Sequence, residues 1–192
     1  TNTGAVDTDW DLAEENLGAL TVTPPGYIYY LNQDFEGAFP PAAWTNVRNS
    51  GDCDWLSSAT TGYTNYTGGS GDFADANSDA CGSGTTMDVE LRTPSMDLSG
   101  ATAPQLEYLT YYRHLGSSYG NVDISVDGGT TWDNLVTYNV TGNHQEAIDL
   151  SAYAGESDVV IRFHYVSPGW NWYWQVDDVI VAEVDPVTWL AE

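Results

Sequence analysis

The chain is predicted to fold as an all-β protein with two packed sheets. Apolar and polar residues alternate with a period of two in several segments, which are bounded by Gly, Asn, Asp and Pro at a spacing typical of β-sandwiches. Eight Trp and 13 Tyr favour strands over helices. No stretch of the sequence keeps an apolar period of about 3.6 residues, the signature of an amphipathic helix.

The clearest alternation predicts four strands, at residues 105–114, 122–126, 159–165 and 172–181. Residues 50–86 interrupt the pattern, because they are rich in Gly, Ser, Thr, Asn and Asp. A loop of this length inside a compact domain is usually functional or held by a ligand.

Three parts are expected along the chain. Residues 1–26 end in the break Thr23-Pro24-Pro25-Gly26, and they are interpreted as the end of a preceding module or a linker strand, since a lone strand cannot bury its own face. Residues 27–182 form the main domain, and residues 183–192 are a linker or the start of a following module. Neighbouring domains of the same chain are therefore expected partners.

Charge excludes two classes of partner. The 192 residues include 28 Asp and Glu but only four Arg and no Lys, which gives a formal net charge of −24. Such a field repels phosphate backbones and anionic lipid, so we expect no nucleic-acid partner. Membrane insertion is not expected either, because no apolar run approaches the about 18 residues of a membrane span.

The two cysteines, Cys53 and Cys81, lie in Gly- and Ser-rich sequence about 28 residues apart. A disulfide that closes this loop is the favoured interpretation, and metal ligation by two cysteines without a nearby His is the alternative. A disulfide, excess acid and the absence of lysine are typical of an oxidising, extracellular setting. We therefore expect the protein to be secreted or displayed at the cell surface.

Residues Ser125 to Trp132 match the Asp-box pattern S-x-D-x-G-x-T-W. Its physical content is a hairpin in which Asp127 bonds turn amides, glycine takes a positive φ, and Trp132 folds back over the turn. The motif recurs in sialidases, but it occurs once here and no propeller-like repeat accompanies it. A structural role is therefore favoured over an enzymatic one.

Acidic residues gather near both ends of the expected domain, at Asp34 and Glu36 and at Asp177 and Asp178. Alternation places Asp177 and Asp178 on opposite faces of a strand, so one of them faces the core or a loop, where an unpaired carboxylate is costly. Calcium, which accepts about six to eight irregular oxygen ligands, would resolve this conflict. The aspartates of the long loop add candidates that are individually expected to be solvated: Asp52, Asp54, Asp72, Asp75 and Asp79.

Six short motifs in a fixed order resemble the MAM-like jelly-roll domains, which include the cleaved adhesin domains of gingipains and related bacterial choice-of-anchor modules. The motifs are Asn32 to Gly37, Phe39 to Trp44, Asp54-Trp55, Glu90 to Ser99, Ile148 to Gly155 and Trp174 to Val179. The resemblance runs from about residue 32 to 182. It implies a jelly-roll β-sandwich with a structural cation where the N- and C-terminal strands meet.

Carried over residue by residue, the resemblance implies that Glu36, Asp177 and Asp178 bind calcium, with Asp34 beside Glu36. Asp79 matches an acidic position that is common in the bacterial branch of the family. Extracellular animal MAM domains use four cysteines whereas this chain has two, so the disulfide pairing is not inherited from the family.

Catalysis is not expected, because the three histidines lie far apart in sequence and no G-x-S-x-G elbow or Cys–His pair occurs. Aromatic residues point instead to binding. Trp170, Trp172 and Trp174 are spaced to share one strand face, and Tyr173 lies on the other. Two alternatives stay open: these rings pack in the core, or Trp170 and Tyr173 project and stack on sugar rings or contact a protein. Tyr119 is a further exposed candidate.

The sequence thus predicts a non-catalytic extracellular adhesion or ligand-binding module of a larger protein. It is expected to be stabilised by calcium, and its candidate ligands are carbohydrate and extracellular protein. The alternative is a purely structural spacer or an accessory domain of a secreted protease or glycoside hydrolase.

Overall fold

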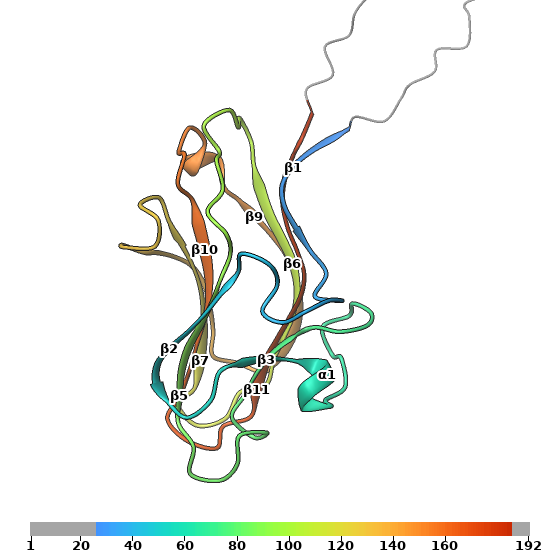
Figure 1. Cartoon of the computed structure of the whole chain (residues 1–192), viewed down its shortest axis with the longest axis vertical. Helices are drawn as coiled ribbons and strands as arrows, with labels where there is room; N and C mark the ends of the chain where they lie inside the picture. Colours follow the sequence, from blue (N-terminus) through green and yellow to red (C-terminus); the bar gives the residue numbers. More distant parts are fainter. Residues whose placement is uncertain (1–25, 186–192) are drawn as a thin grey trace, which may run out of the picture.

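The computed structural model describes residues 26–185 as two antiparallel sheets that face each other (Figure 1). The first sheet runs in the order β3 (Trp55–Ser57), β4 (Ala74–Asn77), β11 (Tyr173–Val184), β6 (Gln105–Tyr112) and β9 (Gly142–Asp149), and β1 (Tyr27–Gln33) also pairs with β11. The second sheet runs in the order β2 (Thr45–Gly51), β5 (Met87–Arg92), β10 (Val160–Ser167), β7 (Tyr119–Ser125) and β8 (Asp133–Tyr138). The predicted all-β sandwich is confirmed.

The core between the sheets is built largely from aromatic rings. Trp174 of β11 lies at its centre, with ring centroids 5.3 Å from Trp55 and 5.9 Å from Phe163. Its Nε1 donates a hydrogen bond of 2.7 Å to Thr110 Oγ1, so the one polar atom of the indole is satisfied inside the core. Rings of this size each remove a large apolar area from water, which favours the folded sandwich.

All four strands that alternation predicted are present, as β6, β7, β10 and β11. The long segment 50–86 is more ordered than its composition indicates, since it contains β3, β4 and the single-turn helix α1 (Ser58–Thr61). The predicted disulfide is also confirmed: Cys53 and Cys81 are bonded, with Cα atoms 6.2 Å apart. A short 3-10 turn, η1 (Ser151–Tyr153), precedes β10.

The Asp-box forms the predicted hairpin between β7 and β8. Asp127 accepts hydrogen bonds from the backbone amides of Thr130 and Thr131, at 3.0 and 2.8 Å. These bonds hold the pKa of Asp127 well below its usual range, and the bond from Thr131 has the largest effect. Gly128 and Gly129 have φ of +67° and +90°, as the turn requires. The structural role predicted for this motif is confirmed.

Trp132, which ends the Asp-box, covers two cations on the outer face of the second sheet. Its ring centroid is 4.3 Å from Arg162 Cζ and 5.1 Å from Arg92 Cζ. Both arginines bond the buried Glu90, and Arg162 also bonds Asp123 at 2.8 Å. Half of the chain's four arginines are therefore used in one structural network.

The limits of the described residues bear on the predicted domain boundaries. β1 begins at Tyr27, and β11 continues to Val184. Most of the expected flanking segments, residues 1–25 and 186–192, lie outside the described residues. Between residues 26 and 185, none of the helices has the length and apolar character that crossing a membrane requires.

Candidate functional site

β11 changes its orientation at Asp177 and Asp178. Before these residues Trp174 and Val176 point into the core, and after them Val179 and Val181 do so. The phase shifts because the pairing with β6 is irregular between Asp177 and Ile180, where Asp178 has φ of +49°. Regular alternation was therefore the wrong basis for placing the two acids on opposite faces.

Both carboxylates instead approach the same loop residue, Gly69. A Cβ built on this glycine would overlap Asp177 Oδ2 and would lie 3.2 Å from Asp178 Oδ2. The loop is fastened to Asp177 by Asn65, whose Nδ2 donates to Oδ2 at 2.9 Å, and by Thr67 Oγ1 at 3.3 Å. Asp177 is fully buried beneath the loop, and this burial raises its pKa to about 6.

Glu36 meets the same loop two residues further on. Its Oε1 accepts from the Asp72 amide at 2.9 Å, and a Cβ on Gly71, which has φ of +75°, would overlap this oxygen. Asp34 Oδ1 accepts from the Glu36 amide at 3.2 Å and so fixes the turn that carries Glu36. The structure therefore brings Glu36, Asp177 and Asp178 against residues 69–72, with Asp34 in support.

Asp79 does not join these acids. The register of β4 on β11 pairs Asn77 with Tyr173 and Ala74 with Val176, so Asp79 and Asp177 lie beyond opposite ends of β4. Asp79 Oδ2 accepts from the Tyr63 hydroxyl at 2.8 Å. The structure thus places Asp79 apart from Asp177, at the other end of β4.

The cationic side chains are engaged away from the three acids. Arg48 pairs with Asp54, Arg92 and Arg162 with Glu90, and Arg113 stacks 3.8 Å above the ring of Trp172. Among residues 26–185, no three Asp, Glu, His or Cys side chains are already gathered as a metal-binding group. The acids at residues 69–72 therefore converge on one loop without a cationic partner among the arginines.

The predicted aromatic binding residues separate into exposed and covered ones. Trp170 is 54% exposed, whereas Tyr173 is only 2% exposed because Tyr63 and Tyr111 pack over it. Tyr119 is half-buried with its ring edge-on to His164. Tyr173 is therefore not available to a ligand.

The shared strand face expected for the three tryptophans is wrong as well. β11 begins only at Tyr173, and Trp172 has φ of +71°, so Trp170 and Trp172 belong to the preceding loop. Trp174 alone points into the core.

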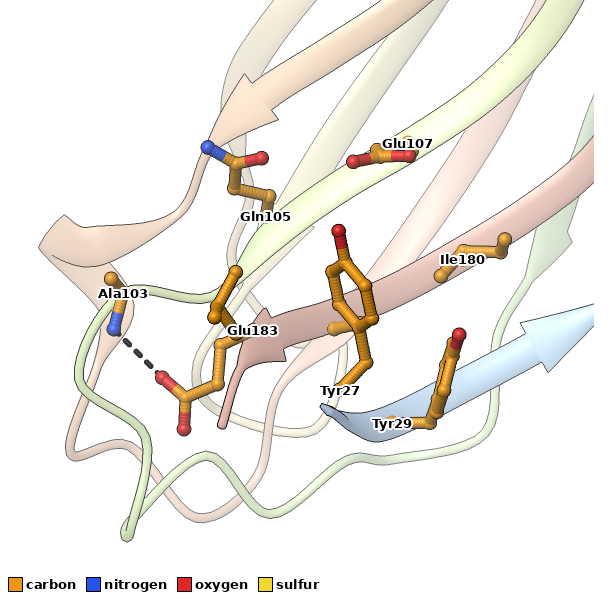
Figure 2. A pocket seen from close by; sticks show the side chains of 9 residues that line it. Tyr27, Tyr29, Ala103, Gln105, Glu107, Ile180 and Glu183 are labelled. Carbon is orange, nitrogen blue, oxygen red and sulfur yellow. Dashed lines mark hydrogen bonds between the residues drawn. The ribbon is translucent and has the colours of Figure 1, made fainter. Parts of the chain in front are cut away.

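The outer face of the first sheet carries a groove that the sequence did not reveal. It has a volume of about 310 Å³ and is lined by residues of β1, β6 and β11. Tyr27 and Tyr29 project side by side from β1 with ring centroids 6.1 Å apart, and they are 58% and 56% exposed (Figure 2). Ile180 forms the apolar floor, and Gln105 and Glu107 stand on β6 (Figure 2).

One end of the groove is fixed by the buried Glu183. Its carboxylate accepts from the Ala103 amide at 2.8 Å (Figure 2) and from the Tyr30 hydroxyl at 2.7 Å. These hydrogen bonds, of which the one from Ala103 has the largest effect, lower the pKa of Glu183 to about 2. The carboxylate therefore stays ionised and ties the loop at 102–103 to β11.

The other end runs toward the acidic loop. A second hollow of about 190 Å³ shares Glu107 and Ile180 with the first and is also lined by Gln145 and Asp178. The second hollow therefore adjoins the groove on the outer face of the same sheet and reaches Asp178, which approaches Gly69 of the loop. The signal for it in the sequence was weak, because the run Tyr27-Ile28-Tyr29-Tyr30 shows no alternation.

This arrangement of two sheets can be compared with known structures. Over 79% of this chain, it superposes on 96% of the K1 cleaved adhesin domain of Lys-gingipain from Porphyromonas gingivalis W83, with a TM-score of 0.55 and 20% identity. The two share one fold. No protein-family model and no curated protein sequence matches the chain.

Two carbohydrate-binding modules have a similar fold. TmCBM61, solved in complex with β-1,4-galactotriose, is matched over 80% of this chain and 97% of its own, with a TM-score of 0.53 and 17% identity. The xylan-binding domain from CBM 22 is matched over 83% of this chain and 97% of its own, with a TM-score of 0.50 and 15% identity. The expected jelly-roll architecture is thus confirmed.

Proposed function

We propose that this chain is a non-catalytic extracellular binding module of a larger protein, and that it holds a carbohydrate chain in the groove on its first sheet. The pair of exposed tyrosines, Tyr27 and Tyr29, carries this proposal. Both rings stand over half exposed beside an apolar floor. They lie away from the part of the sheet where Asn65 and Tyr66 of the long loop bond Asp177, Gln175 and Asn143. Aromatic rings held in this way offer flat contact area at low entropic cost.

The chemistry of the groove fits a sugar chain. A pyranose ring presents an apolar C–H face, which matches Tyr27 and Tyr29, and hydroxyl groups, which match the Glu107 carboxylate and the Gln105 amide. The net charge of −24 disfavours polyanionic glycans. Because a second hollow adjoins the groove at Ile180 and reaches Asp178, the two together suit several linked sugars better than one.

Calcium is proposed as a structural ion of the same module, held by Glu36, Asp177 and Asp178. These residues fit calcium in kind, since they offer only oxygen ligands and lie against a glycine loop whose missing Cβ atoms leave room for carboxylates. Bound calcium supplies the positive charge that the arginines do not bring to this corner. It would thus join the segment after β1, the loop at 69–72 and the bulge of β11.

A glycan array tests the proposed ligand. The wild type is expected to bind neutral oligosaccharides of several residues, and the double variant Tyr27→Ala/Tyr29→Ala is expected to lose about tenfold in affinity for them, measured by calorimetry. Tyr66→Ala is the matched control, because Tyr66 is exposed but lies on the loop outside the groove. No binding to any glycan would favour the spacer instead, and equal binding by the double variant would mean that the groove is not the binding site.

A further inference from the structure

The loop between β10 and β11 presents an exposed tryptophan at the far end of the sandwich from the groove. Trp170 precedes the first residue of β11, whereas Tyr27 pairs with Val184 at its last residue. A strand of 12 residues separates them, roughly 35–40 Å in extended form. Any site at Trp170 is therefore distinct from the groove.

Buried serines hold this loop in one conformation. Ser78, which is fully buried, donates from its Oγ to the Trp172 carbonyl at 2.7 Å and accepts from the Asn171 amide at 3.0 Å. Ser167, also fully buried, donates to the Gly169 carbonyl at 2.7 Å. The positive φ of Trp172 is thus maintained by surrounding hydrogen bonds, which is typical of functional loops.

The result is a pocket of about 350 Å³ with a mixed lining. Trp170 and Trp172 form aromatic walls, Leu115 is an apolar wall that is 45% exposed, and Asp79 completes the lining. The Trp170 Nε1 donates to the Asp79 carbonyl at 3.3 Å, which orients the indole. One carboxylate oxygen of Asp79 accepts from Tyr63, and the carboxylate keeps lone pairs for further donors.

The lining narrows the class of ligand. The Trp172 ring already carries the guanidinium of Arg113 at 3.8 Å, so a second cation placed here would be repelled. Polyanions are disfavoured by the net charge of −24. A neutral polyol satisfies the remaining features, because its C–H face stacks on Trp170 and its hydroxyl groups donate to Asp79.

We propose that Trp170 and Asp79 form a second carbohydrate site, which receives a single sugar or the end of a glycan chain at the loop end of the sandwich. It shares its ligand class with the proposed function but does not depend on the groove. Two sites at opposite ends of one strand would let the module engage two glycan chains, so that binding to a multivalent surface exceeds the affinity of either site.

The test compares four proteins on one glycan array, with calorimetry on each glycan that binds: wild type, Trp170→Ala, Asp79→Asn and Tyr27→Ala/Tyr29→Ala. We expect some glycans to lose about tenfold in affinity with Trp170→Ala or Asp79→Asn and to be unaffected by the groove variant. Asp79→Asn keeps an oxygen that accepts a hydrogen bond from Tyr63. Melting temperatures will check that each variant folds.

The outcomes separate the two proposals. If Trp170→Ala binds every glycan as the wild type does, the second site is overturned and the groove stands. If binding depends on Trp170 and Asp79 alone, the groove is overturned and the second site stands. If Trp170 affects capture of proteins but of no glycan on the array, or if the wild type binds none, the carbohydrate assignment of this pocket is wrong.

Discussion

Asn65 donates a hydrogen bond of 2.9 Å to the buried carboxylate of Asp177, although the two residues lie 112 positions apart in the sequence. This contact fastens the long loop across the outer face of β11. It also places the loop glycines against Asp177, Asp178 and Glu36, which approach from two other segments. The acidic corner therefore exists only in the folded protein, and any ion bound there stabilises the fold.

Calcium is expected to raise the melting temperature relative to chelator. At a calcium concentration of a hundred times Kd, binding to the folded state alone adds about 2.7 kcal/mol, or roughly 5–10 °C for a domain of this size. Glu36→Gln and Asp178→Asn should each remove most of this rise, as measured by scanning calorimetry in calcium and in chelator.

Glu156→Gln is the matched control for the calcium experiment. Glu156 is exposed and lies in the turn before β10, away from residues 69–72, so this variant should keep the full rise. A melting temperature that is the same in calcium and in chelator for the wild type would show that the proposed ion does not exist.

Gly71→Ala is expected to be more damaging than a comparable glycine substitution elsewhere. The residue has φ of +75°, and its new Cβ would overlap Glu36 Oε1, so we expect a loss of about 2–3 kcal/mol in unfolding free energy. Gly62→Ala has a similar φ of +69° but open space around the Cβ, and it should cost only about 1 kcal/mol. Urea unfolding of both variants measures the difference, and equal losses would mean that Glu36 is not held against the loop.

Much of the sandwich was predictable because burial imposes its own period on the sequence. The rows of buried residues in β6 and, from Ile161 on, in β10 alternate with more exposed ones, and both strands were predicted from the sequence pattern. The disulfide was predictable on a different ground. Two thiols in an acidic chain without lysine have few alternatives to a disulfide bond.

The bulge in β11 was not predictable in this way. Alternation treats Asp177 and Asp178 as opposite, whereas the structure turns both toward one glycine, and only the phase of Val179 and Val181 reveals the extra residue. Tyr27 and Tyr29 were missed for another reason. Their exposure depends on which half of the sheet face stays open, and this is decided by where a distant loop lies.

Reduction of the disulfide is expected to destabilise the protein strongly. The bond between Cys53 and Cys81 closes a loop with a sequence separation of 28. On the chain-entropy model, its removal raises the entropy of the unfolded chain and lowers the free energy of unfolding by about 3–4 kcal/mol. Cys53→Ser/Cys81→Ser should show this loss in urea unfolding under oxidising conditions. Titration of the unfolded, unreduced wild type should find no free thiol, and two thiols per chain would contradict the bond.

The buried Asp75 should make the stability fall as the pH rises. It is fully buried on β4, Asn77 Nδ2 donates to its Oδ2 at 2.9 Å, and its Oδ1 has no partner among residues 26–185. This burial raises the pKa from 3.8 to about 6, so the folded state holds the proton more tightly than the unfolded chain does. Its stabilising contribution is therefore full below about pH 4 and lost between about pH 4 and 6.

Asp75→Asn tests this pH dependence, because the amide resembles the neutral acid at every pH. Above about pH 6 the variant should exceed the wild type by up to about 3 kcal/mol in unfolding free energy, and the difference should vanish below about pH 4. Asp133→Asn, at an exposed position on β8, should stay within about 0.5 kcal/mol of the wild type throughout. Urea unfolding from pH 4 to 7 measures both, and a difference for Asp75→Asn that does not change with pH would mean that this carboxyl does not titrate in the folded protein within that range.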